Sequence, residues 1–271
     1  GLPRPVQVVH RQARLDFELL DWRSETVDEQ RLAERAEAEC ARGFDLTRAP
    51  LQRLLLIRVA EQGYHLAWTS HHILMDGWSS SQLFGEVMEQ YHQGSSTGEV
   101  GRYRDFIAWL QRQDQGALEN FWKDRLQRLD EPTSLSQAVH PRHVSDEQGH
   151  HALYTRWDGE RTARLQQRCR EIRITANTLV QGAWLLLLQR YTGQAAPCFG
   201  ATVAGRPEGL AGADRMLGLF INTLPVIGRM DAGQPLLDWL QALQRDNLEL
   251  REHAHAPLAD VQRWSGQGGQ P

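Results

Sequence analysis

Residues 70–79, Ser-His-His-Ile-Leu-Met-Asp-Gly-Trp-Ser, are the stretch that decides the fold of this chain of 271 residues. Two apolar segments with strand character, Leu51–Ala60 and Tyr64–Ser70, precede it and are separated by a polar break at residues 61–63. After it, Ser79–His92 has apolar residues at helical spacing and serines at its start, which predicts a helix capped by serine. The stretch is therefore predicted to form a turn between a strand and a helix.

This turn carries groups that suit acid–base chemistry. His71 and His72 are adjacent imidazoles, and Asp76 follows the second histidine by four positions. Gly77 can adopt backbone angles that a side chain forbids, so we expect a sharp turn that presents its neighbours to a cavity. From these residues alone, two histidines that are buried or that cap the turn remain the plainer alternative.

Strand and helix candidates alternate in both halves of the chain, which indicates the α/β or α+β class. Residues 129–150 are polar, contain prolines and histidines and lack periodicity, which predicts a linker between two lobes. The predicted domains are residues 1–130, which carry the turn, the linker 131–150, and residues 151–271.

Further elements follow from apolar periodicity. Helices are predicted at residues 26–41, 102–128 (broken at Gln115-Gly116), 160–173, 236–253 and 177–191, the last of them buried on most sides. Strands are predicted at Val6–Val9, His151–Trp157, Pro197–Val203 and Met216–Ile227.

The composition disfavours several classes of function. The net charge is −4 and the isoelectric point about 6.3, so the chain offers no basic field for nucleic acid and no polybasic patch for a membrane. The longest purely apolar run, Ala183–Leu188, is too short to span a bilayer, and no signal peptide is visible. Three scattered cysteines suit a reducing compartment, so we expect a cytoplasmic location.

No metal site is predicted. Four histidines match no usual zinc spacing, and no cysteines or acidic residues complete a ligand set around them: His140, His143, His150 and His151. His253 and His255 near Asp260 could form another site, but a helix end followed by Pro257 is the plainer account.

The residues His71–Ser79 resemble the HHxxxDG signature of condensation domains of nonribosomal peptide synthetases, which belong to the chloramphenicol-acetyltransferase-like acyltransferases. Three further stretches are similar to motifs of this family and stand in the same order: YRDFIAW at 103–109, LGLFINTLP at 217–225 and, more weakly, HAPLADV at 255–261. The resemblance covers nearly the whole chain. It implies two similarly folded lobes, with mixed sheets covered by helices and an active-site tunnel between the lobes.

Two motifs that precede the signature in the family, one like SxxQxRxW and one like RHExLR, are absent from this sequence. We therefore expect an internal fragment of such a domain, with some sheet edges and apolar faces uncovered. On this interpretation the chain alone would be unstable or would aggregate.

The resemblance assigns the role of general base to His72. Peptide-bond formation needs a group that orients an amine and takes its proton, and an imidazole has a pKa near that task. Because α-amino groups have a pKa of about 7.7–8.0, a very strong base is unnecessary. His71, Asp76 and Gly77 complete the catalytic motif, and His71 is expected to point elsewhere because adjacent residues do not easily face one cavity.

The resemblance implies roles for four other residues. Arg206, in Gly205-Arg206-Pro207, is expected to form an ion pair with Asp76, with a solvated loop arginine as the alternative. Trp78 is expected to pack and to shape the tunnel. Asn222 and Ser79 are assigned to substrate binding, although an ordinary strand-end hydrogen bond would also account for Asn222.

The implied function is condensation of a carrier-bound acyl or peptidyl thioester with the amine of a carrier-bound aminoacyl group. The domain itself would bind no cofactor, because the 4′-phosphopantetheine arms belong to upstream and downstream peptidyl carrier domains; an adenylation domain would be adjacent. One alternative is a free-standing acyltransferase that uses coenzyme A, although the plant-type DFGWG stretch is absent. The other is a catalytically inactive recruiting platform, which the intact His72 and Asp76 disfavour. Trp78 disfavours an epimerisation domain, and the His-His-Asp set disfavours a heterocyclisation domain.

Overall fold

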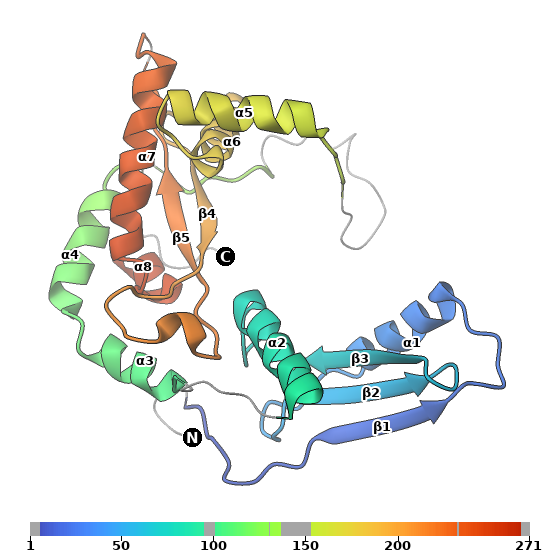
Figure 1. Ribbon diagram of the computed structural model, residues 1–271. Coiled ribbons are helices and arrows are strands. Elements are labelled where there is room, and N and C mark those ends of the chain that lie inside the picture. Colours follow the sequence, from blue (N-terminus) through green and yellow to red (C-terminus); the bar gives the residue numbers. More distant parts are fainter. Residues whose placement is uncertain (1–5, 95–100, 130, 137–152, 232, 267–271) are drawn as a thin grey trace. The chain divides into compact units, whose positions relative to one another are not determined.

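The computed structural model describes residues 6–94, 101–129, 131–136, 153–231 and 233–266 (Figure 1). Packing divides the chain into two compact units. Unit 1 consists of Gly1–Tyr103 and Arg215–Leu219, and unit 2 consists of Arg104–Asp214 and Phe220–Pro271.

This division differs from the predicted domains. It falls after Tyr103 instead of within residues 131–150, because helix α4 (Gln115–Leu126) belongs to the core of unit 2. Three apolar residues of this helix are buried in that core: Leu118, Trp122 and Leu126. Of the predicted linker, residues 137–150 lie outside the described residues.

A three-stranded sheet forms the centre of unit 1, in the order β1-β2-β3. Strand β1 (Asp16–Asp21) runs parallel to β2 (Gln52–Arg58), and β3 (Tyr64–Ser70) runs antiparallel to β2. The hairpin of β2 and β3 follows the two predicted apolar segments and leads directly into residues 71–76.

Helix α1 (Glu29–Ala41) covers one face of this sheet. Arg53 lies on the same face of β2 as the buried Leu55, since side chains alternate along a strand, and it donates to the carbonyl oxygen of Glu39 at 2.8 Å. The Glu39 carboxyl is itself buried. Burial raises its pKa, but hydrogen bonds from two neighbouring arginines outweigh burial, so this pKa lies below its ordinary value.

Two predictions for unit 1 need correction. Helix α2 (Gly77–Gln93) begins two residues earlier than predicted, and the carboxylate of Asp76 caps it in place of a serine. The residues Val6–Val9 are exposed and outside any strand. A strand needs a partner for its backbone hydrogen bonds, and β1 is the segment that pairs with the free side of β2.

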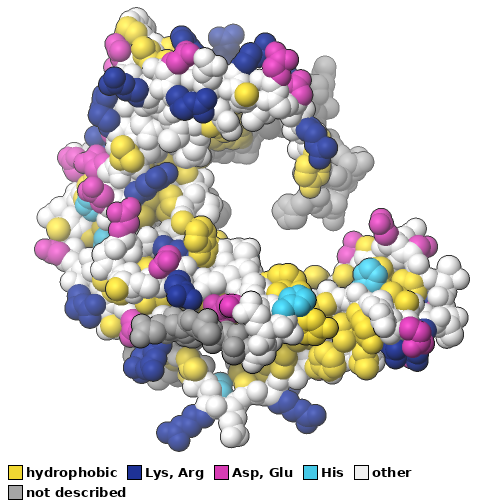
Figure 2. Space-filling view, in the orientation of Figure 1, with side chains coloured by type: hydrophobic (Ala, Val, Ile, Leu, Met, Phe, Trp, Pro, Cys, Tyr) yellow, Lys and Arg dark blue, Asp and Glu magenta, His cyan; other side chains and the backbone are white. Residues whose placement is uncertain are grey.

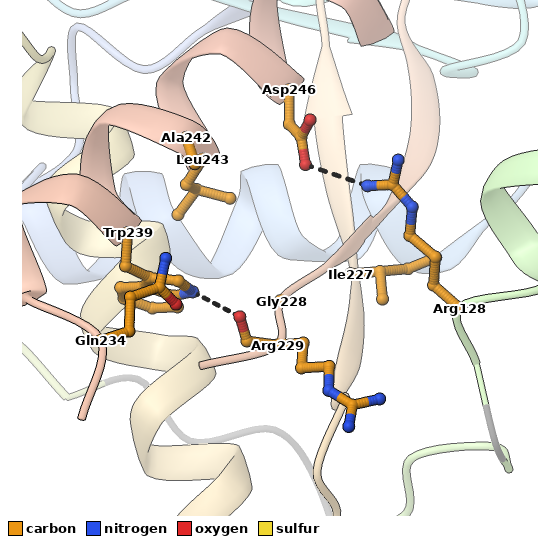
Figure 3. A pocket seen from close by; sticks show the side chains of 9 residues that line it. All are labelled: Arg128, Ile227, Gly228, Arg229, Gln234, Trp239, Ala242, Leu243 and Asp246. Atoms are coloured by element: carbon orange, nitrogen blue, oxygen red, sulfur yellow. Dashed lines mark hydrogen bonds and ion pairs between the residues drawn. The ribbon is translucent and has the colours of Figure 1, made fainter. Parts of the chain in front are cut away.

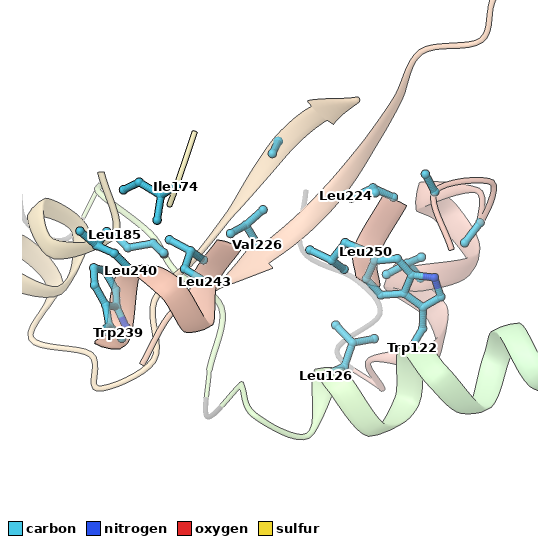
Figure 4. Close-up of a cluster of buried hydrophobic side chains, with 14 of the residues drawn as sticks. Trp122, Leu126, Ile174, Leu185, Leu224, Val226, Trp239, Leu240, Leu243 and Leu250 are labelled. Carbon is cyan, nitrogen blue, oxygen red and sulfur yellow. The ribbon is translucent and has the colours of Figure 1, made fainter. Parts of the chain in front are cut away.

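Unit 2 packs helices around an antiparallel pair of strands, β4 (Cys198–Val203) and β5 (Asn222–Ile227). Figure 4 shows part of its core, which includes Leu224 and Val226 of β5 and Leu240 and Leu243 of α7. Besides α4 and most of α3 (Tyr103–Gln111), its described helices are α5 (Gly159–Glu171), α6 (Ala176–Thr192), α7 (Leu236–Glu252) and α8 (Leu258–Trp264).

Two strands predicted in this half differ in the structure. The predicted strand Met216–Ile227 forms only from Asn222 onward, because residues 215–219 pack within unit 1. Residues 153–157 of the predicted strand His151–Trp157 are exposed and form no strand, and no strand among the described residues pairs with them; the first two residues lie outside the described part.

One predicted helical stretch is confirmed and one predicted helix differs. The helical pattern at 102–128 forms two helices, as the predicted break allows, with Asp114 as the cap of the second, just ahead of Gln115-Gly116. Helix α6 is not buried on most sides, because several large residues are exposed at helical spacing: Val180, Trp184, Leu187 and Tyr191.

One face of the sheet in unit 1 is apolar and exposed. The strand register places Phe17 and Leu19 of β1 and Leu66 of β3 on one face, and these side chains are 55%, 58% and 50% exposed. Figure 2 shows hydrophobic side chains gathered over these strands. Contiguous apolar patches of this kind usually mark a contact surface in soluble proteins.

We predict that the isolated 271-residue chain self-associates through this face, because burying apolar surface contributes roughly 25 cal/mol per Å². Leu66→Ser should shift light scattering toward the monomer. Leu46→Ser, at a similarly exposed leucine outside the strands, should leave the association unchanged. A monodisperse monomer of the unsubstituted chain at micromolar concentration would contradict the prediction.

Candidate active site

The predicted turn between strand and helix is present, since β3 ends at Ser70 and α2 begins at Gly77. Two backbone hydrogen bonds hold its first half. The N–H of His71 donates to the carbonyl oxygen of Leu51 at 2.9 Å. The N–H of Leu74 donates to the carbonyl oxygen of His71 at 3.0 Å. The start of the turn is thereby fixed to the β2–β3 hairpin.

The two histidines of the turn differ in their surroundings. The Nδ1 atom of His71 accepts a hydrogen bond from the backbone N–H of Ile73 at 3.1 Å. The imidazole of His71 also packs edge-on against the ring of Phe44, with 6.2 Å between the ring centres. His71 is half-buried and its Nδ1 atom is used within the turn, and the expectation that it points away from a reacting group stays a prediction. His72 is exposed, so its imidazole is the one open to an incoming molecule.

Asp76 is buried at the end of the turn, with 2% of its surface exposed. Its Oδ1 atom accepts from the N–H of Ser79 at 2.8 Å, which satisfies one of the unpaired donors at the start of α2. Its own N–H donates to the carbonyl oxygen of Gly218 at 3.1 Å. Asp76 therefore joins the turn, the helix and the segment 215–219.

Ser79 is fully buried, and this placement disagrees with the predicted role in substrate binding. Its hydroxyl donates to the carbonyl oxygen of Gly218 at 2.8 Å and accepts from the N–H of Gly218 at 3.1 Å. A hydroxyl that is enclosed and occupied in this way holds the fold together and does not face a ligand.

Gly77 does not supply the unusual backbone angles that its residue type suggested. It is the first residue of α2, its φ does not lie in the positive region found at glycines such as Gly94, and a Cβ there would meet no atom within 4 Å. The hydrogen bonds of Asp76 account for the shape of the turn instead. Trp78 is 61% exposed, so it borders open space and is not buried in a core.

Asn222 begins β5 in unit 2. Its Nδ2 atom donates to the carbonyl oxygens of Ala254 at 2.9 Å and Ala256 at 2.5 Å, so both amide hydrogens are used within the fold. The ordinary strand-end hydrogen bond, which was the alternative to substrate binding, is therefore present.

Arg206 is half-buried in unit 2 and is not a solvated loop residue. Its Nη1 atom donates to the carbonyl oxygen of Ala213, and its guanidinium lies 4.0 Å from the centre of the Phe220 ring. The preceding Gly205 has a φ of +63°, and a Cβ there would lie 1.8 Å from the carbonyl oxygen of Phe220. Only glycine fits this position. The ion pair of Arg206 with Asp76 stays a prediction.

Sequence reasoning missed Tyr103 and Gly218 as contributors to the site. The hydroxyl of Tyr103 donates to the carbonyl oxygen of Leu219 at 2.7 Å. Burial and, second, the charge of Asp76 raise the pKa of this hydroxyl. Both residues lie in the motif stretches YRDFIAW and LGLFINTLP, so a signal was present, but nothing in either stretch indicates that they contact each other.

A separate cavity of about 230 Å³ lies on unit 2, beside α7 and the end of β5 (Figure 3). Two pairs of polar groups lie at its edge. Arg128 contacts Asp246 at 3.3 Å, and the indole N–H of Trp239 donates to the carbonyl oxygen of Arg229 at 2.9 Å. None of the predicted site residues lines this cavity, so we do not assign the candidate site to it.

The described part of the chain offers neither a metal site nor a membrane-spanning helix. No three His, Cys, Asp or Glu side chains there are arranged to hold a metal ion. The histidines between residues 140 and 151 lie outside that part. No described helix is both long enough and apolar enough to cross a membrane.

Comparison with known families places this chain. The family described as "Condensation domain" matches residues 2–270. This chain belongs to the condensation domain family. It is 39% identical over 273 residues to a linear gramicidin synthase protein of Brevibacillus parabrevis, covering 98% of this chain and 4% of that protein. It is 36% identical over 274 residues to a chondramide synthase of Chondromyces crocatus, covering 98% of this chain and 7% of that protein.

Solved structures share this fold. A holo four-domain nonribosomal peptide synthetase bound to AMP and glycine has a TM-score of 0.73 and 23% identity, covering 95% of this condensation-family chain and 20% of that chain. The EpoB cyclization-docking bidomain from Sorangium cellulosum has a TM-score of 0.74 and 20% identity. This match covers 98% of this chain and 55% of the bidomain chain. The X-domain in complex with OxyB from teicoplanin biosynthesis has a TM-score of 0.74 and 22% identity. This match covers 97% of this chain and 60% of that chain. These neighbours confirm the predicted fold class, and at such identities they show the fold alone.

Two substitutions of Asp76 separate its role as a helix cap from its charge. Asp76→Asn keeps an oxygen that can accept from the N–H of Ser79, whereas Asp76→Ala removes it. We predict that thermal unfolding shows Asp76→Ala to be the less stable of the two by about 0.5–2 kcal/mol, the usual contribution of a cap. Equal stability of the two variants would mean that the cap contributes nothing.

Proposed function

We propose that this chain carries the general base for amide formation in nonribosomal peptide synthesis. The observation that supports it is the exposed imidazole of His72, on a turn whose other polar side chains are occupied in holding it. A base that is open to a reactant and fixed by buried neighbours suits proton transfer, which depends on geometry first and on pKa second.

The proposed reaction joins two carrier-bound substrates. The amine nitrogen of an aminoacyl acceptor attacks the carbonyl carbon of the donor thioester, while His72 orients the amine and takes its proton. The carbon–sulfur bond then breaks, and the departing thiolate receives a proton as the free carrier thiol. An imidazole can accept and return this proton near neutral pH.

The substrates would arrive on the 4′-phosphopantetheine arms of upstream and downstream peptidyl carrier domains, with an adenylation domain adjacent. The domain itself would then need no cofactor. The names of the relatives, a linear gramicidin synthase and a chondramide synthase, favour peptide assembly as the process. The chain spans less than a tenth of those proteins, so these partners are part of the proposal. A cytoplasmic location, proposed here too, suits the three free cysteines.

The alternative functions differ in what they require. A coenzyme A-dependent acyltransferase would accept acyl-coenzyme A without any carrier, and an inactive platform would give no product from either donor. The fold alone does not decide, because one structural neighbour is described as a cyclization domain. The intact His-His-Asp set on an ordered turn favours condensation.

We also propose the ion pair between Asp76 and Arg206. A buried carboxylate needs compensation of its charge, and Arg206 is itself half-buried. Breaking one side of a buried pair costs on the order of 3–5 kcal/mol, so Asp76→Ala and Arg206→Ala should each destabilise the protein. In a double-mutant cycle, the double variant should be less destabilised than the sum of the two single variants. Additive effects would refute the pair.

His72→Ala should lower the rate of condensation by about 10²–10⁴-fold, because a positioned general acid–base group contributes that much. The measurement is dipeptide formation between two loaded carrier domains by the complete condensation domain. His65→Ala is the matched control, since His65 is an exposed histidine on β3 just before the turn, and it should keep the wild-type rate. A near wild-type rate for the His72 variant would overturn the assignment of the base.

A further inference from the structure

The segment Arg215–Leu219 is held in unit 1 by three side chains from earlier in the sequence. Each donates a hydrogen bond to a backbone carbonyl oxygen of the segment. The pairs are Gln82 to Arg215 at 2.7 Å, Ser79 to Gly218 at 2.8 Å and Tyr103 to Leu219 at 2.7 Å. The segment is therefore anchored at its first residue and at its last two residues.

Ser79 is the member of this set that also connects the segment to the turn. Its hydroxyl contacts both the carbonyl oxygen and the N–H of Gly218, and its own N–H donates to the carboxylate of Asp76. The N–H of Asp76 in turn donates to the same carbonyl oxygen of Gly218. These four hydrogen bonds form a closed ring of three buried residues.

The position of Gly218 in this ring cannot adjust freely. A Cβ at Gly218 would lie 2.0 Å from a ring carbon of Tyr103, so the backbone of the segment packs directly on that aromatic ring. If the hydroxyl of Ser79 is removed, the buried N–H of Gly218 loses its acceptor. Gly218 must then shift to find another acceptor. Because Tyr103 blocks movement in one direction, we expect Asp76 at the end of the turn to shift with it.

We propose that Ser79 is a positioning residue that sets the direction of His72 through Gly218 and Asp76. The turn of residues 71–76 is fixed at its start by the hairpin and at its end by this ring, and His72 lies between the two. The proposal rests on the proposed function of His72 as the general base. A displacement of a reacting group by about 1 Å can cost about 10²-fold in rate, so a loosened ring should lower kcat.

The test compares Ser79→Ala with Ser81→Ala in the complete condensation domain. Ser81 lies on the same helix, but its hydroxyl is exposed and donates to the carbonyl oxygen of Gly77 at 2.9 Å, outside the ring. Ser79→Ala should lower kcat by about 10-fold to 10²-fold and leave KM for the loaded acceptor carrier within about 2-fold. Ser81→Ala should match the wild type in both.

A second readout does not depend on activity. In protein with ¹³C-labelled histidine, the ring resonance of His72 can be identified by its absence from His72→Ala. Ser79→Ala should shift this resonance, and Ser81→Ala should not. If the wild-type domain forms no amide, the proposed function fails, but the shift of the His72 resonance still decides the positioning role.

Two results would overturn the positioning role. One is a Ser79→Ala protein with wild-type kcat and an unmoved His72 resonance. The second result concerns a replacement variant: if Ser79→Ala does not fold, Tyr103→Phe is measured in its place. This variant removes only the hydroxyl that holds Leu219 and should lower kcat by a smaller factor in the same direction. A wild-type kcat for Tyr103→Phe would then reject the proposal.

Discussion

The hydrogen bonds of the backbone N–H and carbonyl oxygen of Gly218 are the constraint on which the described site depends. Its carbonyl oxygen accepts from the N–H of Asp76 and from the hydroxyl of Ser79, and its N–H donates back to that hydroxyl. All of these groups are buried, so no water is at hand to replace a lost partner, and each bond is worth more than at a surface. The turn that exposes His72 is thus shaped by a backbone segment that is distant in sequence.

The parts of the fold that the sequence predicted well are those with a local signal. The hairpin of β2 and β3 follows from two apolar segments and the helix α2 from helical apolar spacing, and both signals depend on neighbours within a few positions. The bond between Ser79 and Gly218 joins residues 139 positions apart, and no local pattern specifies such a partner. A serine near the start of a helix is consistent with a cap, a ligand contact or a buried tie, and only tertiary packing decides among them.

Three glycines, two in the motif stretches and one just before Arg206, show the same limit. Gly205 and Gly218 are required because a Cβ would collide, in one case with the carbonyl oxygen of Phe220 and in the other with the ring of Tyr103. Gly77 has neither a collision nor a positive φ, although the sequence made it the most evident candidate for a strained backbone. A glycine in a motif therefore predicts a special position, but the cause at that position comes from whatever packs against it.

The division between buried and exposed residues in the turn explains how one fold can serve different reactions. Structural neighbours described as a cyclization domain and as an X-domain match this chain with the same TM-score of 0.74, so the backbone alone does not discriminate among their functions. Asp76 at the end of the turn and Ser79 in α2 are buried and hold its shape, whereas the side chain of His72 is exposed. An exposed position can change its chemistry while the buried ring keeps the geometry, because the two sets of residues share no hydrogen bond among those described here. On the proposed function, the chemistry of the reaction would reside in His72, and the accuracy of its placement would reside in the buried residues Asp76, Ser79 and Gly218.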